Sequence, residues 1–445
     1  MENYDIIIIG GGVAGNGAAL DFVEAGKRVA VIENDQWGGT CPNRGCDPKK
    51  ILLSAVEAQR HSAQMVGKGI EKAPIINWPD LIEYKNTYTN PVSESTKKNL
   101  LDAGVSIYEG TGEFIDESNI QVNNDKLSAD QFIIATGARP SILDIKGKEH
   151  LLTSRDFLDL PKMPETVTFI GGGYISFEFA AMAQAAGAKV HLIHHNNRPL
   201  KAYDKELVKD LMKQFEQLNI DIHLNIDSQA IEENKNGLVI KGKDGFELNT
   251  DIVIGATGRL PNIEQLKLDQ ANVDYDKKGI LVNDNLQTSN PNIYAMGDIL
   301  SKKQPKLTSV AGIESDYLVS LLTEKSKVKI NYPAIPTIVF STPKMAQVGV
   351  KAVEAEENPN QYKISTIDAT DWFSYMRVNE PISKIKIIEK KENGQLVGAS
   401  VLNNQADPLI NLFSIFINKK MKAEEISDIG WAYPSLASDL PYFYQ

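Results

Sequence analysis

The stretch Asp5-Ile-Ile-Ile-Ile-Gly10-Gly-Gly-Val-Ala-Gly15 decides the fold of the N-terminal region. Its apolar run predicts a buried parallel strand that ends at the glycines, and we expect a helix from there to about Ala25. Lys27-Arg-Val-Ala-Val-Ile-Glu33 predicts the next strand. A Gly-x-Gly-x-x-Gly spacing inside a strand–helix–strand unit, with an acidic residue after the second strand, indicates a dinucleotide site.

The residues of this motif have separate tasks. Gly10 permits the tight turn, and Gly12 lets the backbone approach a pyrophosphate at the helix N-terminus. Glu33 can accept hydrogen bonds from a ribose. The same pattern recurs at Gly171-Gly-Gly173, after a strand predicted from Thr166. Two such motifs about 160 residues apart predict two α/β, Rossmann-like domains, one for each of two dinucleotides.

The character of the sequence changes from Pro333 onward. The stretches Pro336–Phe340, Lys384–Ile388 and Leu396–Val401 predict strands of an antiparallel sheet. Helices are expected at about 404–418 and 422–429. This region is therefore predicted to be a separate α+β domain.

Length and composition restrict the class of protein. A chain of 445 residues needs more than one compact core. The net charge of −11 argues against nucleic acid or an anionic membrane surface as a partner. No apolar run approaches the ~20 residues of a membrane span. The first strand begins at Asp5, which leaves no room for a targeting peptide, so we expect a cytoplasmic protein.

Two cysteines are the whole cysteine content of the chain, in Cys41-Pro-Asn-Arg-Gly-Cys46 directly after the first motif. Four intervening residues allow a disulfide, and the pair offers too few ligands for zinc. A helix N-terminus and the cations of Lys49 and Lys50 should lower a thiol pKa, whereas Asp47 should raise it. We interpret the pair as a dithiol that exchanges electrons with a flavin, the alternative being two inert cysteines.

Several motifs together resemble one family. They are Gly38-Gly-Thr-Cys41 through Lys50, the two Ala-Thr-Gly motifs at Gly137 and Gly258, and Tyr-Ala-Met-Gly-Asp298. They resemble the flavin-dependent pyridine nucleotide–disulfide oxidoreductases, the family of glutathione reductase and dihydrolipoyl dehydrogenase.

This resemblance implies a homodimer with active sites shared between subunits. It implies an FAD-binding domain at 1–147, an NAD(P)H-binding domain at 148–283, a return to the FAD-binding domain at 284–331 and a dimerisation domain at 332–445.

The resemblance also implies roles for individual residues. Cys46 would lie against the flavin as a charge-transfer thiolate, and Cys41 would be the outer thiol that attacks the acceptor. Lys50 would lie near flavin N5 with Glu178 as its ion-pair partner, and Tyr174 would cover the nicotinamide pocket. The residues implied for FAD are Gly10, Gly12, Gly15, Glu33, Gly39, Thr40, Thr136, Gly137 and Asp298. Those implied for the nicotinamide nucleotide are Gly171, Gly173, Tyr174, His194, His195, Arg198, Lys201, Gly258 and Arg259.

The nicotinamide nucleotide is predicted from the end of the second strand of its domain. Enzymes of this type that use NADH usually carry an acidic residue there, whereas this chain has His194. His195, Arg198 and Lys201 follow, and a basic set without a carboxylate suits a 2′-phosphate. We therefore predict NADPH rather than NADH.

The C-terminal motif departs from the family. Members carry His-Pro-Thr with a glutamate five residues after the histidine; here Tyr433 stands at the histidine position and Ser438 at the glutamate position. All six histidines lie at or before residue 223. A tyrosine, with a pKa of about 10, is a poor base at pH 7 but can donate a proton. Tyr433, helped by Asp439, would act as a weaker acid, or the acceptor would need no proton relay.

Other departures restrict the acceptor. Glutathione reductases carry a serine at the place of Val13 and an arginine at the place of Leu20, so glutathione is disfavoured here. Without a third cysteine, mercuric reductases and the large thioredoxin reductases are disfavoured too.

Three hypotheses remain. In the first, electrons pass from NADPH through FAD and the Cys41–Cys46 pair to a small disulfide or related thiol-reactive oxidant. In the second, the protein is a diaphorase-type reductase of quinones, metal ions or another small-molecule acceptor. In the third, it is a redox-responsive interaction protein with negligible turnover.

Overall fold

The computed structural model describes residues 2–235, 237–325 and 328–444. The chain divides into two compact units, each made of three segments. The first contains Met1–Ile51, Ile82–Ser141 and Gly258–Tyr332, and the second contains Leu52–Leu81, Ile142–Thr257 and Pro333–Gln445. The sequence predicts that the chain returns to the FAD-binding domain at residue 284. In the structure the first unit resumes at Gly258, because β16 (Arg259–Pro261) pairs with β7 (Ala138–Pro140).

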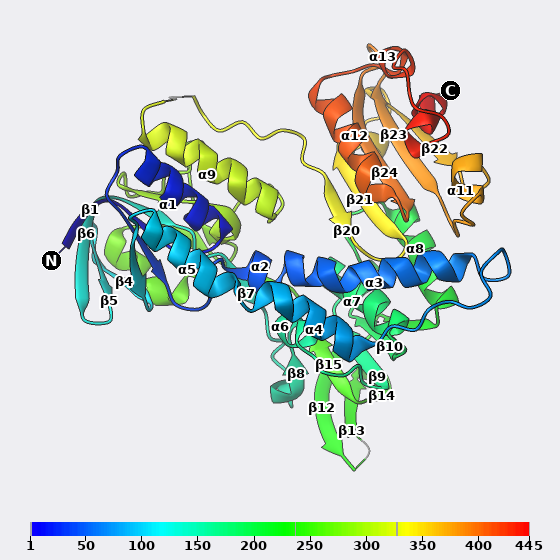
Figure 1. Ribbon diagram of the computed structural model, residues 1–445, viewed down its shortest axis with the longest axis horizontal. Helices are drawn as coiled ribbons and strands as arrows, with labels where there is room; N and C mark the ends of the chain where they lie inside the picture. Colours follow the sequence, from blue (N-terminus) through cyan, green and yellow to red (C-terminus); the bar gives the residue numbers. More distant parts are fainter. Residues whose placement is uncertain (1, 236, 326–327, 445) are drawn as a thin grey trace. The chain divides into compact units, whose positions relative to one another are not determined.

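The first unit is built on a sheet with the order β3-β2-β1-β6-β5-β4, with β19 paired to β6. Its strands are β1 (Glu2–Ile9), β2 (Val29–Glu33), β3 (Ser106–Glu109), β4 (Gly112–Asp116), β5 (Asn119–Val122), β6 (Asp125–Ile134) and β19 (Ile293–Ala295). The four isoleucines of β1 are at most 2% exposed, as expected for a central parallel strand covered on both faces. Helices α1 (Val13–Glu24) and α9 (Thr308–Leu322) pack together beside this sheet (Figure 1).

The second unit contains the second nucleotide-binding sheet, in the order β11-β10-β9-β15-β8. Its strands are β8 (Leu151–Leu152), β9 (Thr166–Ile170), β10 (Lys189–His194), β11 (Ile220–Leu224) and β15 (Ile252–Gly255), and its helices include α6 (Ser154–Leu158), α7 (Tyr174–Ala185) and α8 (Lys205–Gln217). A three-stranded sheet of β12 (Ser228–Asn234), β13 (Gly237–Gly242) and β14 (Glu247–Thr250) adjoins it. Both predicted strand–glycine–helix units are present.

The C-terminal sheet is antiparallel, in the order β20-β21-β24-β23-β22. Its elements are β20 (Thr337–Val339), β21 (Lys344–Gly349), α10 (Ala352–Glu357), β22 (Tyr362–Asp368), α11 (Phe373–Met376), β23 (Lys384–Lys390), β24 (Leu396–Asn403), α12 (Ala406–Asn418) and α13 (Ala423–Ser427). Helices α12 and α8 both contact β24, so every residue of that strand is buried. The α+β prediction for this region is confirmed, with β21 and β22 added to the strands that the sequence indicated.

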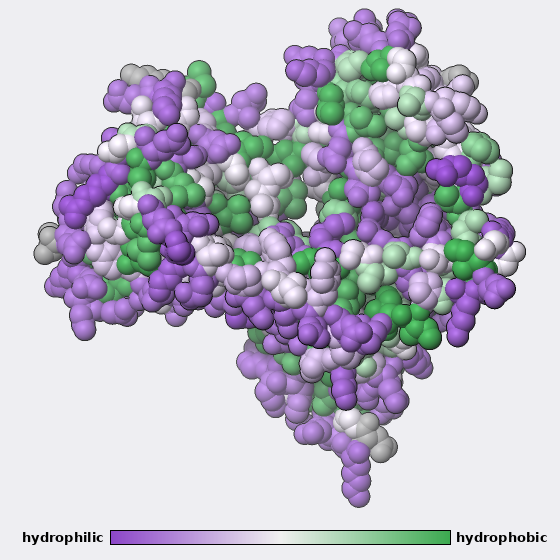
Figure 2. Space-filling view, in the orientation of Figure 1, coloured by the Kyte–Doolittle hydropathy of each residue, from purple (hydrophilic) through white to green (hydrophobic). Residues whose placement is uncertain are grey.

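Several large apolar side chains of this C-terminal region are exposed. They are Phe373, Met376, Ile415, Tyr433 and Tyr442, each more than half exposed. Figure 2 shows green, hydrophobic surface among the elements labelled α12 and β24 in Figure 1.

Within the described ranges, no helix has the length and apolar character needed to cross a membrane.

Candidate redox and nucleotide sites

The two cysteines lie on consecutive helices of the first unit. Cys41 is in α2 (Thr40–Arg44), and Cys46 is the first residue of α3 (Cys46–Gln64). The loop before them touches the first glycine motif, since a Cβ added to Gly39 would lie 2.6 Å from Cα of Gly12. Gly39 has φ +70°, which favours glycine. The sequence therefore places the dithiol directly beside the first nucleotide loop.

Thr308 connects the two sulfur atoms. Its hydroxyl donates to Sγ of Cys41 at 3.2 Å and lies 3.8 Å from Sγ of Cys46. Cys46 is exposed, and Cys41 is half-buried. The pKa of Cys46 is lowered to about 6 by the hydrogen bond from Cys41, by Thr308 and by Lys49. The pKa of Cys41 is raised by its hydrogen bond to Cys46 and by burial. At neutral pH the reduced pair therefore carries one thiolate, on Cys46, and one thiol, on Cys41.

The position of Cys46 explains part of this asymmetry. The first residues of an α-helix present unpaired N–H groups and the positive end of the helix dipole, which favour a thiolate. The sequence left open whether Asp47 or the lysines would dominate. For Cys46 the pKa falls although Asp47 raises it, whereas for Cys41 the carboxylate of Asp47 adds to the upward shift.

The first glycine motif has the geometry that a pyrophosphate needs. Helix α1 is preceded by Gly12, and no side chain caps its N-terminus. A Cβ at Gly15 would lie 2.0 Å from O of Gly10, so the turn accepts only glycine there. Exposed N–H groups at a helix N-terminus and a loop without side chains fit the diphosphate of FAD.

Glu33 lies where a ribose is expected, and its carboxylate also shapes the loop. One oxygen accepts from N of Gly11 at 2.7 Å, and the other accepts from N of Asn34 at 2.9 Å and N of Asp35 at 2.8 Å. Burial raises its pKa, and these backbone hydrogen bonds oppose that effect. Glu33 therefore fixes the glycine loop in addition to its predicted contact with a ribose.

The remaining residues predicted for FAD lie where distant segments meet. Asn262 donates from Nδ2 to O of Thr136 at 2.8 Å, and its backbone N donates to O of Gly137 at 3.0 Å. Asp298 lies in a short 3₁₀ turn, Gly297–Ile299. Glu314, which is fully buried, accepts from N of Gly297 at 2.7 Å and from the Tyr332 hydroxyl at 2.6 Å, and it pairs with Lys302. Glu314 thus holds the turn that carries Asp298.

The second glycine motif has the same form. Gly171 has φ +130°, and a Cβ there would lie 2.2 Å from O of Ala256, whereas a Cβ at Gly173 would meet nothing within 4 Å. Gly173 precedes α7, again without a side-chain cap. This leaves a bare helix N-terminus that fits a second pyrophosphate.

Tyr174 and Glu178 share one side of α7 but differ in burial. Tyr174 is 46% exposed, while Glu178 is 1% exposed and accepts from N of Phe340 at 2.9 Å. Both act electrostatically on the phenol of Tyr203, whose pKa is raised to about 12 mainly by burial. The predicted pairing of Lys50 with Glu178 joins residues of the two separate units and stays a prediction.

The basic residues predicted to read a 2′-phosphate are not equivalent. The ring of His194 is 8% exposed and packs under the glycine loop, where a Cβ on Gly172 would lie 2.6 Å from its Nδ1. Burial lowers its pKa, which favours the neutral form of the ring in the protein without a nucleotide. His195 pairs with Asn196 at 2.8 Å, and Lys201 is exposed. Arg198 donates to O of Tyr203 at 3.0 Å.

Two further residues predicted for NADPH fall in the first unit. Gly258 and Arg259 follow the segment that leaves the second unit at Thr257. The Arg259 guanidinium donates to O of Ala138, and O of Gly258 accepts from N of Ser141 at 2.9 Å. The structure thus groups these two residues with the first unit, whereas Gly171 and Gly173 belong to the second.

The C-terminal residues differ strongly in exposure. Tyr433 is 79% exposed, whereas Asp439 is 8% exposed, and burial raises the pKa of Asp439. Ser438 donates from Oγ to O of Ser435 at 2.6 Å, and its Oγ accepts from N of Ser435 at 3.1 Å, so it supports a turn.

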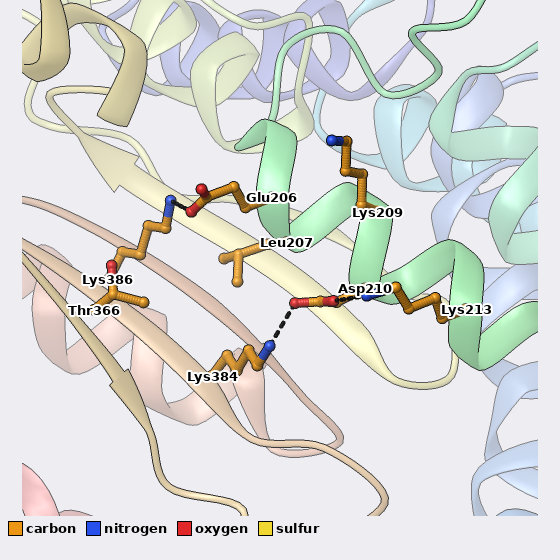
Figure 3. Close-up of a pocket in the computed structure, with 8 residues that line it drawn as sticks. All are labelled: Glu206, Leu207, Lys209, Asp210, Lys213, Thr366, Lys384 and Lys386. Carbon is orange, nitrogen blue, oxygen red and sulfur yellow. Dashed lines mark hydrogen bonds and ion pairs between the residues drawn. The ribbon is translucent and has the colours of Figure 1, made fainter.

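A cavity of about 310 Å³ lies elsewhere in the second unit. Figure 3 shows its lining, in which ion pairs join α8 to β23: Lys386 with Glu206, and Lys384 with Asp210. Because these charges are paired with one another and lie away from both glycine motifs in sequence, we assign the cavity a structural role.

Over the described ranges, no three His, Cys, Asp or Glu side chains are arranged to hold a metal ion.

Sequence reasoning missed three residues of the first unit. Thr308 and Tyr88 contact the redox segment, and Glu314 holds the turn at Gly297. The sequence gives an indication of Glu314, because it is an acidic residue in the mostly apolar run Val310-Ala-Gly-Ile-Glu-Ser and acidic residues are seldom buried without a role. It gives none of Thr308 and Tyr88, because only the fold brings them to the cysteines.

Comparison with known proteins places the chain in a family. The profile of the pyridine nucleotide-disulphide oxidoreductases matches residues 4–314, and that of their dimerisation domain matches residues 335–442. Glutathione reductase of Burkholderia cepacia is 29% identical over 98% of this chain and 97% of its own length. Mercuric reductase of Lysinibacillus sphaericus is 30% identical over 99% of this chain and 82% of its own length.

A solved structure agrees with the sequence comparisons. The HOCl-induced flavoprotein disulfide reductase RclA from Escherichia coli aligns over 99% of both chains, with a TM-score of 0.90 and 25% identity. Its Cu(II) complex aligns over 100% of this chain and 99% of that chain, also with a TM-score of 0.90 and 25% identity. The chain therefore belongs to the pyridine nucleotide-disulphide oxidoreductase family and is an oxidoreductase whose cofactors are FAD and a nicotinamide nucleotide.

Proposed function

We propose that this protein passes electrons from NADPH through the Cys41–Cys46 pair to a small disulfide or related thiol-reactive oxidant. One observation carries the proposal: the Thr308 hydroxyl lies within 3.2 Å of Sγ of Cys41 and 3.8 Å of Sγ of Cys46, at the N-terminus of α3. This arrangement supports a thiolate on Cys46 and a protonated outer thiol on Cys41.

The reaction balances as a disulfide reduction. NADPH and one proton reduce RS–SR′ to RSH and R′SH, and the cysteine pair returns to its starting state in each cycle. Bound FAD supplies two-electron transfer between the nicotinamide and the cysteines. The protein residues orient the thiols and set their protonation.

The proton for the leaving thiolate is assigned to Tyr433 of the partner subunit. The dimerisation domain and the exposed apolar side chains of the C-terminal region support a homodimer with shared active sites. A tyrosine can donate a proton but is a poor base at neutral pH. Replacing Tyr433 by Phe should lower disulfide turnover by ~10-fold or more. Unchanged turnover would remove this role while leaving the electron path intact.

Glutathione itself is disfavoured as the acceptor. Val13 and Leu20 on α1 are 39% and 38% exposed apolar side chains, where glutathione reductases would present a hydroxyl and a cation. The similarity to RclA, an HOCl-induced flavoprotein disulfide reductase, supports a role in reducing products of thiol oxidation.

A second candidate is a reductase of metal ions or quinones. The Cu(II) complex of RclA and the similarity to mercuric reductases favour it. Anaerobic titration of the flavin-loaded protein with NADPH separates the two candidates. A long-wavelength absorbance band with two new thiols supports the cysteine route; flavin bleaching without thiol release, together with full acceptor turnover in Cys41→Ser, supports the second.

A further inference from the structure

A carboxylate lies beside the outer thiol. Sγ of Cys41 is 3.9 Å from Oδ1 of Asp47, and the Tyr88 hydroxyl donates to Oδ2 of Asp47 at 2.7 Å. We infer that Asp47 determines specificity by making Cys41 react with cationic and neutral oxidants in preference to anionic ones. This inference rests on the proposed function, and it names the charge class of the acceptor.

Tyr88 holds the carboxylate in place. It lies in α4 (Trp78–Thr89) and is 45% exposed, so it reaches Asp47 from outside the redox helices. Its pKa is raised to about 12 because it donates to Asp47, and the phenol therefore stays protonated at physiological pH. A hydrogen bond to a carboxylate is stronger than one between neutral groups, which fixes the negative charge near Cys41. Tyr88 is thus a positioning residue.

The charge effects that shift the pKa of Cys41 come from Cys46 and Asp47, and both are negative. The pKa of Cys41 is raised by its hydrogen bond to Cys46, by burial, and by the negative charges of Cys46 and Asp47. Lys49 lowers the pKa of Cys46. Arg44 pairs with Asp35 at 2.7 Å and donates to Gln36 at 2.8 Å. Sγ of Cys41 therefore lies beside two negative groups, the thiolate of Cys46 and the carboxylate of Asp47.

The size of the effect follows from Coulomb's law. Two unit charges ~6 Å apart, with an effective dielectric constant between about 20 and 80, change a rate constant by roughly 3- to 100-fold. Such an effect falls as salt screens partly exposed charges. Discrimination by substrate charge should therefore be measurable with single substitutions.

The test uses the flavin-loaded dimer with NADPH and three disulfides: cystamine, which is cationic, hydroxyethyl disulfide, which is neutral, and oxidised glutathione, which is anionic. For Asp47→Asn we expect kcat/KM to fall about 10-fold with cystamine and to rise about 10-fold with oxidised glutathione. The value with hydroxyethyl disulfide should change less than about 3-fold. Asp47→Glu should keep the order of the unsubstituted protein.

Two controls separate charge selection from general damage. Asp125→Asn makes the same change in net charge. Asp125 is the first residue of β6, and it is the opposite end of this strand that approaches the glycine loop. This variant should therefore leave kcat/KM unchanged with all three disulfides. Tyr88→Phe should shrink the preference for cystamine without reversing it. In the unsubstituted protein, added salt should lower kcat/KM with cystamine and raise it with oxidised glutathione.

The outcomes are distinguishable. Equal changes with all three disulfides in Asp47→Asn would overturn the inference and leave disulfide reduction standing. No reduction of any of the three, with full turnover of quinone or metal ion, would overturn the proposed function and this inference with it. If Asp47→Asn does not fold, Tyr88→Phe decides, and an undiminished preference for cystamine would overturn the inference.

Discussion

The hydroxyl of Thr308 donates to Sγ of Cys41 at 3.2 Å although the two residues lie in segments 267 positions apart. Helix α9 begins at Thr308, and α3 begins at Cys46, so the reactive sulfur atoms lie where two helix N-termini are close. The Thr308 hydroxyl contributes to the lowered pKa of Cys46 and opposes the upward shift of the pKa of Cys41.

Thr308→Val should therefore make Cys46 less reactive at mildly acidic pH. With a Cys46 pKa of about 6, alkylation of the reduced protein by iodoacetamide should increase from about pH 5 and level off above about pH 7. Loss of the hydroxyl should lower the rate at pH 6.5 by about 10-fold. Thr308→Ser keeps the donor and should behave like the unsubstituted protein. An unshifted profile for Thr308→Val would contradict the role of this hydrogen bond.

The two glycines of the second motif have different roles: Gly171 is needed for the fold, and Gly173 for binding the nucleotide. Gly171→Ala would place Cβ 2.2 Å from O of Ala256 at φ +130°, so the second unit should unfold at a clearly lower denaturant concentration. Gly173→Ala meets nothing within 4 Å and should fold normally, but its methyl group should obstruct the pyrophosphate and raise KM for NADPH by about 10-fold or more. Equal unfolding midpoints for the two variants would refute this division.

Nucleotide choice should depend on the exposed basic residues. Lys201→Ala and His195→Ala should each lower kcat/KM with NADPH by about 3- to 10-fold and leave the value with NADH nearly unchanged. His194→Gln should not change the ratio of the two values, because burial lowers the pKa of His194 and favours its neutral form. A higher kcat/KM with NADH in the unsubstituted protein would contradict the NADPH prediction.

The buried lysine of the second unit should matter for stability. Lys386 is 3% exposed and pairs with Asp204 at 3.1 Å and Glu206 at 2.6 Å. Asp204 also caps α8 by accepting from N of Glu206 and Leu207. Lys386→Met leaves a buried carboxylate without its cation, which should lower the free energy of unfolding by about 3–5 kcal/mol.

Chemical denaturation followed by fluorescence measures this loss. Lys384→Met removes a more exposed partner of Asp210 and should cost less. The double variant Lys386→Met with Asp204→Asn should recover part of the stability, because the uncompensated charge is gone. No recovery would show that packing, rather than charge, explains the loss.

Local patterns allowed much of the fold to be predicted. The glycine spacing around Gly10 and Gly171 encodes a tight turn at a strand end, and a run such as Ile6–Ile9 encodes a strand covered on both faces. Strand β21 was missed because Lys344-Met-Ala-Gln-Val-Gly shows no clear alternation. Its lysine is buried by pairing with Glu57 and Asp407, which the sequence does not reveal.

The site was predicted where chemistry is encoded in adjacent residues and missed where it depends on the fold. Cys41 and Cys46 could be recognised from their spacing. The burial of His194 could not, because it depends on a ring filling the space that Gly172 leaves. Tyr88 reaches Asp47 across 41 positions, and no periodicity records that contact.

The three-segment construction of the first unit has a consequence for protein synthesis. Strand β19 and helix α9 are translated only after Ile142–Thr257, which belongs to the other unit. At 5–20 residues per second, a nascent chain that has completed β6 waits roughly 10–40 s for these elements. During that time the edge at Phe132–Ile134, which later pairs with β19, and the surface of α1 that packs on α9 lack their partners. Ribosome stalling within the intervening segment should therefore favour aggregation and recruit chaperones to the N-terminal sheet.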